Sequence, residues 1–137
     1  MLPGVFLAKK KSGEEYFRAA ITKFNKRISL GSFSTEKEAY LAYMEAKSLY
    51  ENPEIEPLNL RSYIQYLPFE KGITILNHRD YKTYIKTPIY LRQGYFSYYL
   101  EGVGELKFDN DDLFYYSSHR ILNHDGHLYV NDYGMQY

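Results

Sequence analysis

The stretch Tyr16-Phe17-Arg18-Ala19-Ala20-Ile21-Thr22 decides the fold of the first part of the chain, because its residue types alternate. Phe17, Ala19 and Ile21 share one side of an extended chain, and the remaining residues take the other side. Such alternation is typical of a β-strand that has one face on a core and one face in water. We therefore predict a half-buried strand here.

Two further strands are expected beside this stretch. After a short polar turn, Ile28 and Leu30 alternate with polar residues, which predicts a strand that follows the first one. Val5 and Leu7 place another strand ahead of the stretch, joined to it by the polar loop 9–14. The three strands together predict an antiparallel sheet with one apolar and one polar face.

A helix is predicted directly after the sheet. Thr35 and Glu38 form a capping box, in which hydroxyl and carboxylate satisfy free backbone donors at the start of a helix. A stripe of mostly small residues follows at spacings of three and four: Ala39, Ala42, Tyr43, Ala46 and Leu49 or Tyr50. Leu41 and Met44 lie off this stripe, so we expect the second half of the chain to cover the helix.

The segment Glu51-Asn52-Pro53-Glu54-Ile55-Glu56-Pro57 divides the chain, because it has two prolines, three acids and no periodic pattern. We expect a first module over 1–51, a linker over 52–57 and a second unit over 58–137. The 17 basic and 17 acidic residues give zero net charge, but residues 1–51 hold nine of the basic and only six of the acidic ones. The first module is therefore the basic one, and any affinity for a polyanion is expected there.

The second unit contains 13 of the 17 tyrosines and a series of short apolar runs. The runs are 63–67, 73–76, 89–91, 95–100, 105–108, 113–116, 121–122 and 128–130. Their spacing of about ten residues predicts a small antiparallel sheet, barrel or sandwich without a long helix. The fold class is thus α+β: a three-stranded sheet on one helix, followed by a mostly antiparallel β subdomain. Tyrosine suits half-buried strands, although exposed tyrosines would also suit a protein partner.

A β-hairpin is predicted around Asp125 and Gly126, which supply the two positive φ angles of a type I′ turn. His124 and His127 would then face each other across the strands. A bridging metal would need another ligand from elsewhere, such as His78, and strand pairing already accounts for the two histidines. We expect no metal site.

The sequence contains none of the common catalytic motifs. It has no cysteine, which excludes disulfides, thiolate zinc sites and cysteine nucleophiles. Residues 109–112 lack the glycine and distal glutamate of a calcium loop, and residues 77–80 are not followed by a helix with a second histidine, as a His-Asn-His nuclease would require. Phosphate-binding glycine loops and serine nucleophile elbows are also missing. We expect no enzyme, no catalytic residue and no cofactor.

Composition places the chain among globular proteins, since 45% of its residues are apolar and 25% are charged. No apolar run reaches the length of a signal peptide or a membrane-spanning helix. The expectation is a protein without a membrane role, located in the cytoplasm of a bacterial host.

The order of the three strands and the helix, together with three short segments of sequence, resembles a known family. These are Leu30-Gly31-Ser32-Phe33-Ser34-Thr35, Glu38-Ala39 and Ala42-Tyr43, and the likeness spans residues 3–51. They resemble the Apetala-two/ethylene-response-factor (integrase-type) DNA-binding domain, whose bacterial and phage versions often accompany integrases or homing nucleases. In that family a three-stranded sheet packs on one helix and its exposed face enters the major groove. The resemblance therefore implies duplex DNA as a partner.

Most of the family's base-reading side chains are replaced here. Phe6 and Ala8 stand where the plant pattern has arginines, and Ala20 and Thr22 replace an acid and an arginine. Arg27 falls on the position of a DNA-contacting arginine. Basic residues near the sheet remain candidates for nucleic-acid contact, because contacts to phosphates need only positive charge. They are Lys9, Lys10, Lys11, Arg18, Lys23, Lys26 and Arg27. The alternative is an ordinary solvated basic surface.

Two functions from different classes fit these patterns. The first is a small non-enzymatic DNA-binding or regulatory protein of a phage or mobile element, with a second half that forms a homodimer or recruits a partner. The alternative is a protein-binding inhibitor of a host defence system, such as an anti-CRISPR that blocks an RNA-guided effector nuclease with a reused DNA-binding scaffold. Only the first requires an affinity for DNA that falls steeply with salt.

Overall fold

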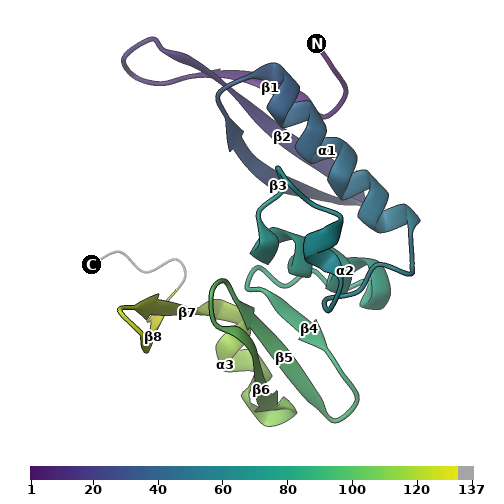
Figure 1. Cartoon of the computed structure of the whole chain (residues 1–137), viewed down its shortest axis with the longest axis vertical. Coiled ribbons are helices and arrows are strands. Elements are labelled where there is room, and N and C mark those ends of the chain that lie inside the picture. Colours follow the sequence, from purple (N-terminus) through teal and green to yellow (C-terminus); the bar gives the residue numbers. More distant parts are fainter. Residues whose placement is uncertain (133–137) are drawn as a thin grey trace.

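The computed structural model describes residues 1–132, and it begins with a three-stranded antiparallel sheet that carries one helix (Figure 1). The elements of this first part are β1 (Val5–Lys9), β2 (Glu15–Lys23), β3 (Lys26–Phe33) and α1 (Glu36–Glu51). The strands lie in the order β1-β2-β3, so β2 is central and β1 and β3 are the edges. The predicted sheet and helix are confirmed.

One face of this sheet forms a core with α1. In the register, Val5 lies opposite Ala19, and Ile21 lies opposite Ile28. These four side chains are buried. Leu7 departs from the prediction, because its side chain is 46% exposed at the edge of the sheet and adds little to the core.

Helix α1 begins directly after Thr35, as predicted, but the Glu38 carboxylate contacts the Thr35 hydroxyl and not the backbone N–H that a capping box uses. The Thr35 hydroxyl oxygen accepts a hydrogen bond from the Glu38 backbone N–H at 3.1 Å and donates one to the Glu38 carboxylate at 3.0 Å. The buried stripe of the helix consists of Ala39, Ala42, Ala46 and Leu49. Three of these four side chains are methyl groups, which lets the helix axis lie close to the sheet.

The second part contains helices, two smaller sheets and turns. Its elements are η1 (Leu60–Ser62), α2 (Phe69–Tyr81), β4 (Ile89–Leu91), β5 (Tyr95–Leu100), β6 (Gly104–Asp109), η2 (Asn110–Asp112), α3 (Leu113–Ser118), β7 (His119–His124) and β8 (His127–Asp132). Strands β4, β5 and β6 form one antiparallel sheet, and β7 and β8 form a hairpin. The chain therefore has the α+β architecture that was expected.

Three predicted strands of the second part are wrong. Residues 73–76 lie in the middle of helix α2, residues 113–116 lie in α3, and residues 63–67 form turns. The expectation that no long helix occurs there is likewise wrong. Every residue from 72 to 79 is buried, so α2 is covered on all sides. The buried residues of α2 include the polar Thr74, Asn77, His78 and Arg79, so burial does not follow residue type here. The short run Ile73-Thr74-Ile75-Leu76 cannot be distinguished from a strand by pattern alone.

The two parts share one core, which confirms that the second half packs on α1. Leu49 of α1 belongs to the same buried cluster as Ile55, Leu60, Ile73 and Leu76. Segment 52–57, expected as a linker, thus contributes a fully buried side chain, Ile55. Figure 1 shows α2 beneath the end of α1, with the β4–β5–β6 sheet beyond it.

Glu45 of α1, not Met44, makes the contact with the loop ahead of α2. Its carboxylate accepts hydrogen bonds from the backbone N–H groups of Gln65, Tyr66 and Leu67, at 2.8, 2.9 and 2.8 Å. Met44 is 39% exposed, so the expectation that the second half covers it is wrong. The face of α1 that contacts this loop is therefore the one that carries Glu45.

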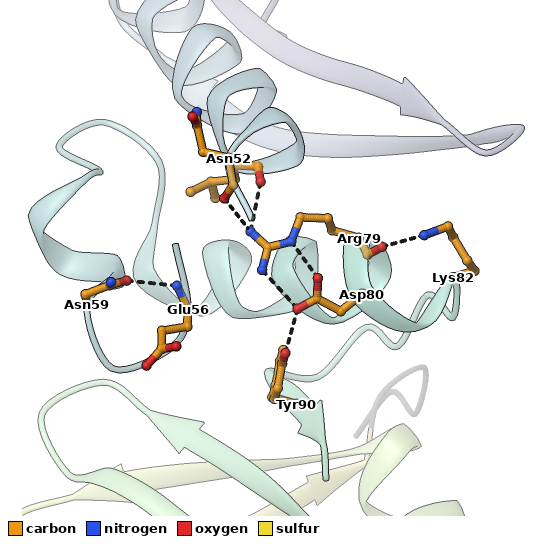
Figure 2. A network of polar contacts seen from close by, with 8 residues as sticks. Asn52, Glu56, Asn59, Arg79, Asp80, Lys82 and Tyr90 are labelled. Atoms are coloured by element: carbon orange, nitrogen blue, oxygen red, sulfur yellow. Dashed lines mark hydrogen bonds and ion pairs between the residues drawn. The ribbon is translucent and has the colours of Figure 1, made fainter. Parts of the chain in front are cut away.

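Arg79 of α2 caps the C-terminal end of α1 (Figure 2). Its guanidinium donates to the carbonyl oxygens of Leu49 and Asn52, both at 3.0 Å, where α1 has free acceptors and no basic residue of its own. It also forms an ion pair of 2.7 Å with Asp80, which accepts a further bond from the Tyr90 hydroxyl. Burial alone would raise the pKa of Asp80, but its hydrogen bonds with Arg79 and Tyr90 lower it.

A second, smaller core lies between the last two sheets. Phe96 and Tyr98 of β5 are fully buried in it together with Ile121 of β7. The Tyr98 hydroxyl accepts a hydrogen bond from the backbone N–H of Ile121 at 3.0 Å. Several tyrosines of the second part therefore have a structural role, as their preference for half-buried strands predicts. Among the described residues, no helix is both long and apolar enough to cross a membrane.

Candidate nucleic-acid interface

The face of the first sheet opposite α1 carries two arginines and an aromatic ring. Phe6 of β1 lies opposite Arg18 of β2, and both alternate with side chains of the core. Arg27 of β3 lies opposite Thr22 on the same face. The Arg27 guanidinium lies 4.7 Å from the centre of the Phe6 ring, within the range of a cation–π contact. Because side chains alternate between the two faces of a strand, Phe6, Arg18 and Arg27 lie on the same face of the sheet.

Small side chains form the floor between the arginines. Ala8, Ala20 and Ser29 line a hollow of about 400 Å³ together with Arg18 and Arg27. The pairing of β2 and β3 shifts by one residue between Ala19 and Ala20, which is a β-bulge and sharpens the local twist. The two arginines and these small side chains thus line the same hollow.

Both arginines are available to an anionic ligand. Within residues 1–132, neither Arg18 nor Arg27 forms an ion pair, and both residues are exposed. A guanidinium offers a planar fork of donors that fits a phosphate or the edge of a guanine. Of the seven basic residues predicted to bind nucleic acid, Arg18 and Arg27 are the two that lie together on the face of the sheet opposite α1.

The lysines of the first loop lie apart from that pair. Lys9 ends β1 opposite Glu15, and the loop then carries the chain away from the rest of the molecule, as Figure 1 shows. Lys10 forms an exposed ion pair with Glu14 at 3.2 Å. Such a pair contributes little to stability and leaves the lysine free to exchange partners. Lys9, Lys10 and Lys11 are all exposed.

Lys23 and Lys26 lie at the opposite end of the sheet and contact aromatic rings. They flank the tight turn at Phe24 and Asn25, whose φ angles are 52° and 61°. The Lys23 ammonium lies 5.6 Å from the Tyr50 ring centre, and that of Lys26 lies 4.7 Å from the Tyr84 ring centre. Lys26 thus contacts the second part of the chain, whereas Lys23 contacts α1 of the first part, and sequence patterns indicated neither contact.

A tyrosine–histidine pair lies beneath this turn. The Tyr50 hydroxyl is 2.7 Å from Nδ1 of His78, and His78 is 2% exposed. Burial, followed by the charges of Lys82 and Lys26, lowers the pKa of His78, while burial raises the pKa of Tyr50. His78 is thus held in its neutral form inside the joint between the two parts, where it packs edge-on against Tyr84.

The histidines of the last hairpin lie as predicted. Asp125 and Gly126 have φ angles of 50° and 84°, and His124 pairs directly with His127. The His124 side chain is 79% exposed beside Asp125. Among the side chains that the structure describes, no three histidine, aspartate or glutamate groups gather as a metal site would require.

Comparison with known proteins finds no matching family model, no similar curated protein and no similar solved structure. The resemblance of residues 3–51 to the Apetala-two/ethylene-response-factor domain therefore stays a prediction.

Proposed function

We propose that this is a small non-enzymatic DNA-binding or regulatory protein of a phage or mobile element that works in the bacterial cytoplasm. It contacts duplex DNA through the face of the sheet that carries Arg18 and Arg27. The observation that carries the proposal is that these two arginines, exposed and outside any described ion pair, line one hollow together with small side chains. The resemblance to a DNA-binding family points to the same face.

The geometry suits a duplex approached from the major groove. That groove is about 12 Å wide and admits a β-ribbon, whose side chains then reach base edges. Arg27 is held against Phe6 and takes the position nearest the bases, while Arg18 and the loop lysines Lys9 to Lys11 contact phosphates. Phosphate contacts position the protein, and base contacts specify the sequence.

The experiment is a fluorescence-anisotropy titration of duplex DNA with wild-type protein and with the double variant R18Q/R27Q. The control is K37Q/K47Q, which removes the same charge from α1 on the other side of the sheet. We expect R18Q/R27Q to weaken binding on the order of tenfold or more, because two guanidinium contacts to an anion are lost. Equal loss in the control would mean that only net charge matters, and it would contradict the proposed interface.

A second candidate function is supported by exposed apolar side chains in the second part. Phe114 is 89% exposed, and Leu128 and Tyr129 are 45% and 50% exposed. Large exposed apolar groups often mark a protein-binding surface. They favour the protein-binding alternative, an inhibitor of a host RNA-guided nuclease. Retention of target cleavage by such nucleases in the presence of excess protein would speak against it.

A further inference from the structure

A groove lies between the edge strand β3 and the second part of the chain. Ser29 and Gly31 of β3 line one wall. Lys71 of α2, Lys86 of the segment ahead of β4 and Arg120 of β7 line the other wall, and the groove holds about 260 Å³. Three cations from three separate elements of the second part therefore meet at one edge of the sheet.

The groove has more positive than negative charge. Its acid is Glu70, which forms an ion pair with Arg120 at 3.5 Å and accepts a bond from the backbone N–H of Glu101 at 3.3 Å. Lys71 and Lys86 form no ion pair within the described part of the chain. Burial lowers the pKa of Lys71, because the charged ammonium has lost part of its hydration. A bound anion would offset this loss.

The groove continues the open face of the sheet. Ser29 lines both this groove and the hollow between Arg18 and Arg27. Lys86 also lines a larger groove of about 800 Å³, whose lining contains Lys26 and one acid, Asp111. Cations of both parts of the chain thus follow one connected surface around strand β3.

We propose that the β3 groove binds the phosphate backbone of the same nucleic acid that contacts Arg18 and Arg27, with Lys71 and Lys86 as the contacting cations. This inference rests on the proposed function and extends it, because it makes the second part of the chain a DNA-contacting element. A nucleic acid fits better than an acidic peptide, since its evenly spaced phosphates can follow a connected row of cations from the sheet into the groove.

The test compares duplex-DNA affinity of the full chain over a series of salt concentrations for wild type, K71Q/K86Q and the matched control K37Q/K47Q. Each lost phosphate contact removes about 0.9 from the magnitude of the slope of log affinity against log salt. We expect K71Q/K86Q to lose about 1.8 in slope and to bind more weakly on the order of tenfold, and the control to do neither. Circular dichroism checks folding, and K86Q alone, at an exposed position, replaces the double variant if Lys71 proves necessary for stability.

The outcomes separate this inference from the proposed function. If wild type binds with a steep salt slope and K71Q/K86Q matches it, the β3 groove carries no DNA and the inference is overturned, while the sheet-face function stands. If wild type shows no salt-dependent affinity, both are overturned. If K71Q/K86Q weakens binding and R18Q/R27Q does not, the groove is the DNA site and the sheet face is not. If wild type binds an acidic peptide, and K71Q/K86Q loses that binding but keeps the wild-type affinity for DNA, the groove belongs to a protein partner and the inference is overturned.

Discussion

The Arg27 guanidinium lies 4.7 Å from the centre of the Phe6 ring, and the two side chains come from the opposite edge strands of the first sheet. This contact spans the strand that carries Arg18 and favours one orientation of the Arg27 side chain. A positioned arginine suits the reading of a base, whereas a freely moving one serves mainly as a positive charge.

Replacing Arg27 by alanine should relax sequence preference as well as weaken binding. The expected loss is about 1 to 3 kcal/mol at the recognised base if the guanidinium makes a bidentate contact to guanine. Selection of binding sites from a random duplex library measures this preference for wild type and variant. An unaltered selected profile would show that Arg27 reads no base.

Replacing Lys9, Lys10 and Lys11 together by alanine should weaken binding equally for all DNA sequences. These lysines lie on an exposed loop at the end of the sheet and should meet phosphates alone. The salt slope should therefore become shallower by up to about 2.7. Gel-shift titrations with two unrelated duplexes test this. If affinity for both duplexes stays the same, the loop lies outside the DNA contact.

Glu45→Ala should destabilise the protein, because the backbone N–H groups of Gln65, Tyr66 and Leu67 would lose a charged acceptor. We expect the free energy of unfolding to fall by about 2 kcal/mol or more. Met44→Glu is the neighbouring comparison. Met44 is 39% exposed, so the new charge would stay in water. The effect of Met44→Glu should therefore be below about 0.5 kcal/mol.

Urea denaturation measures both variants. A larger loss from Met44→Glu than from Glu45→Ala would mean that the second part packs over a different face of α1.

Stability should fall as pH falls below about 6.5, because His78 binds a proton more readily in the unfolded chain than in the folded protein. Its folded pKa is lowered from the usual value of 6.5 by burial, Lys82 and Lys26. The full contribution of His78 is thus present above that pH and is lost as pH falls toward the folded pKa. His78→Gln should flatten this part of the profile. Thermal melting between pH 7.5 and 5 measures it, and an equal slope in the variant would assign the effect to other groups.

Sequence patterns predicted the first part of the fold because local and tertiary signals agree there. Alternation in β2 predicts the burial of Ala19 and Ile21 and the exposure of Arg18, although Ala20, predicted on the polar face, is buried at the bulge. The Thr35–Glu38 pair marks the start of α1. Helix α2 was missed because its middle residues are buried on all sides, so tertiary packing, not a local pattern, determines the helix. The hairpin at Asp125-Gly126 was predictable because its turn chemistry is local.

The candidate site was predictable only in part. Strand parity places Arg18 and Arg27 on one face, and that follows from sequence alone. Lys23 and Lys26 were grouped with them by charge, but the structure sets them against Tyr50 and Tyr84 of other elements. The cations of the β3 groove come from residues far apart in the chain, so no local pattern could have connected them.

The measurement that tests the proposed DNA-binding function most directly is the salt dependence of wild-type affinity for duplex DNA. Five cations of the sheet face and its loop, namely Lys9, Lys10, Lys11, Arg18 and Arg27, are expected to meet phosphates or bases. We therefore predict that log affinity falls linearly with log salt, with a slope of roughly −4 from these five cations and roughly −6 when Lys71 and Lys86 of the β3 groove also meet phosphates. A lack of binding at low salt, or an affinity that does not change with salt, would contradict this function and leave the protein-binding function as the better interpretation of the fold.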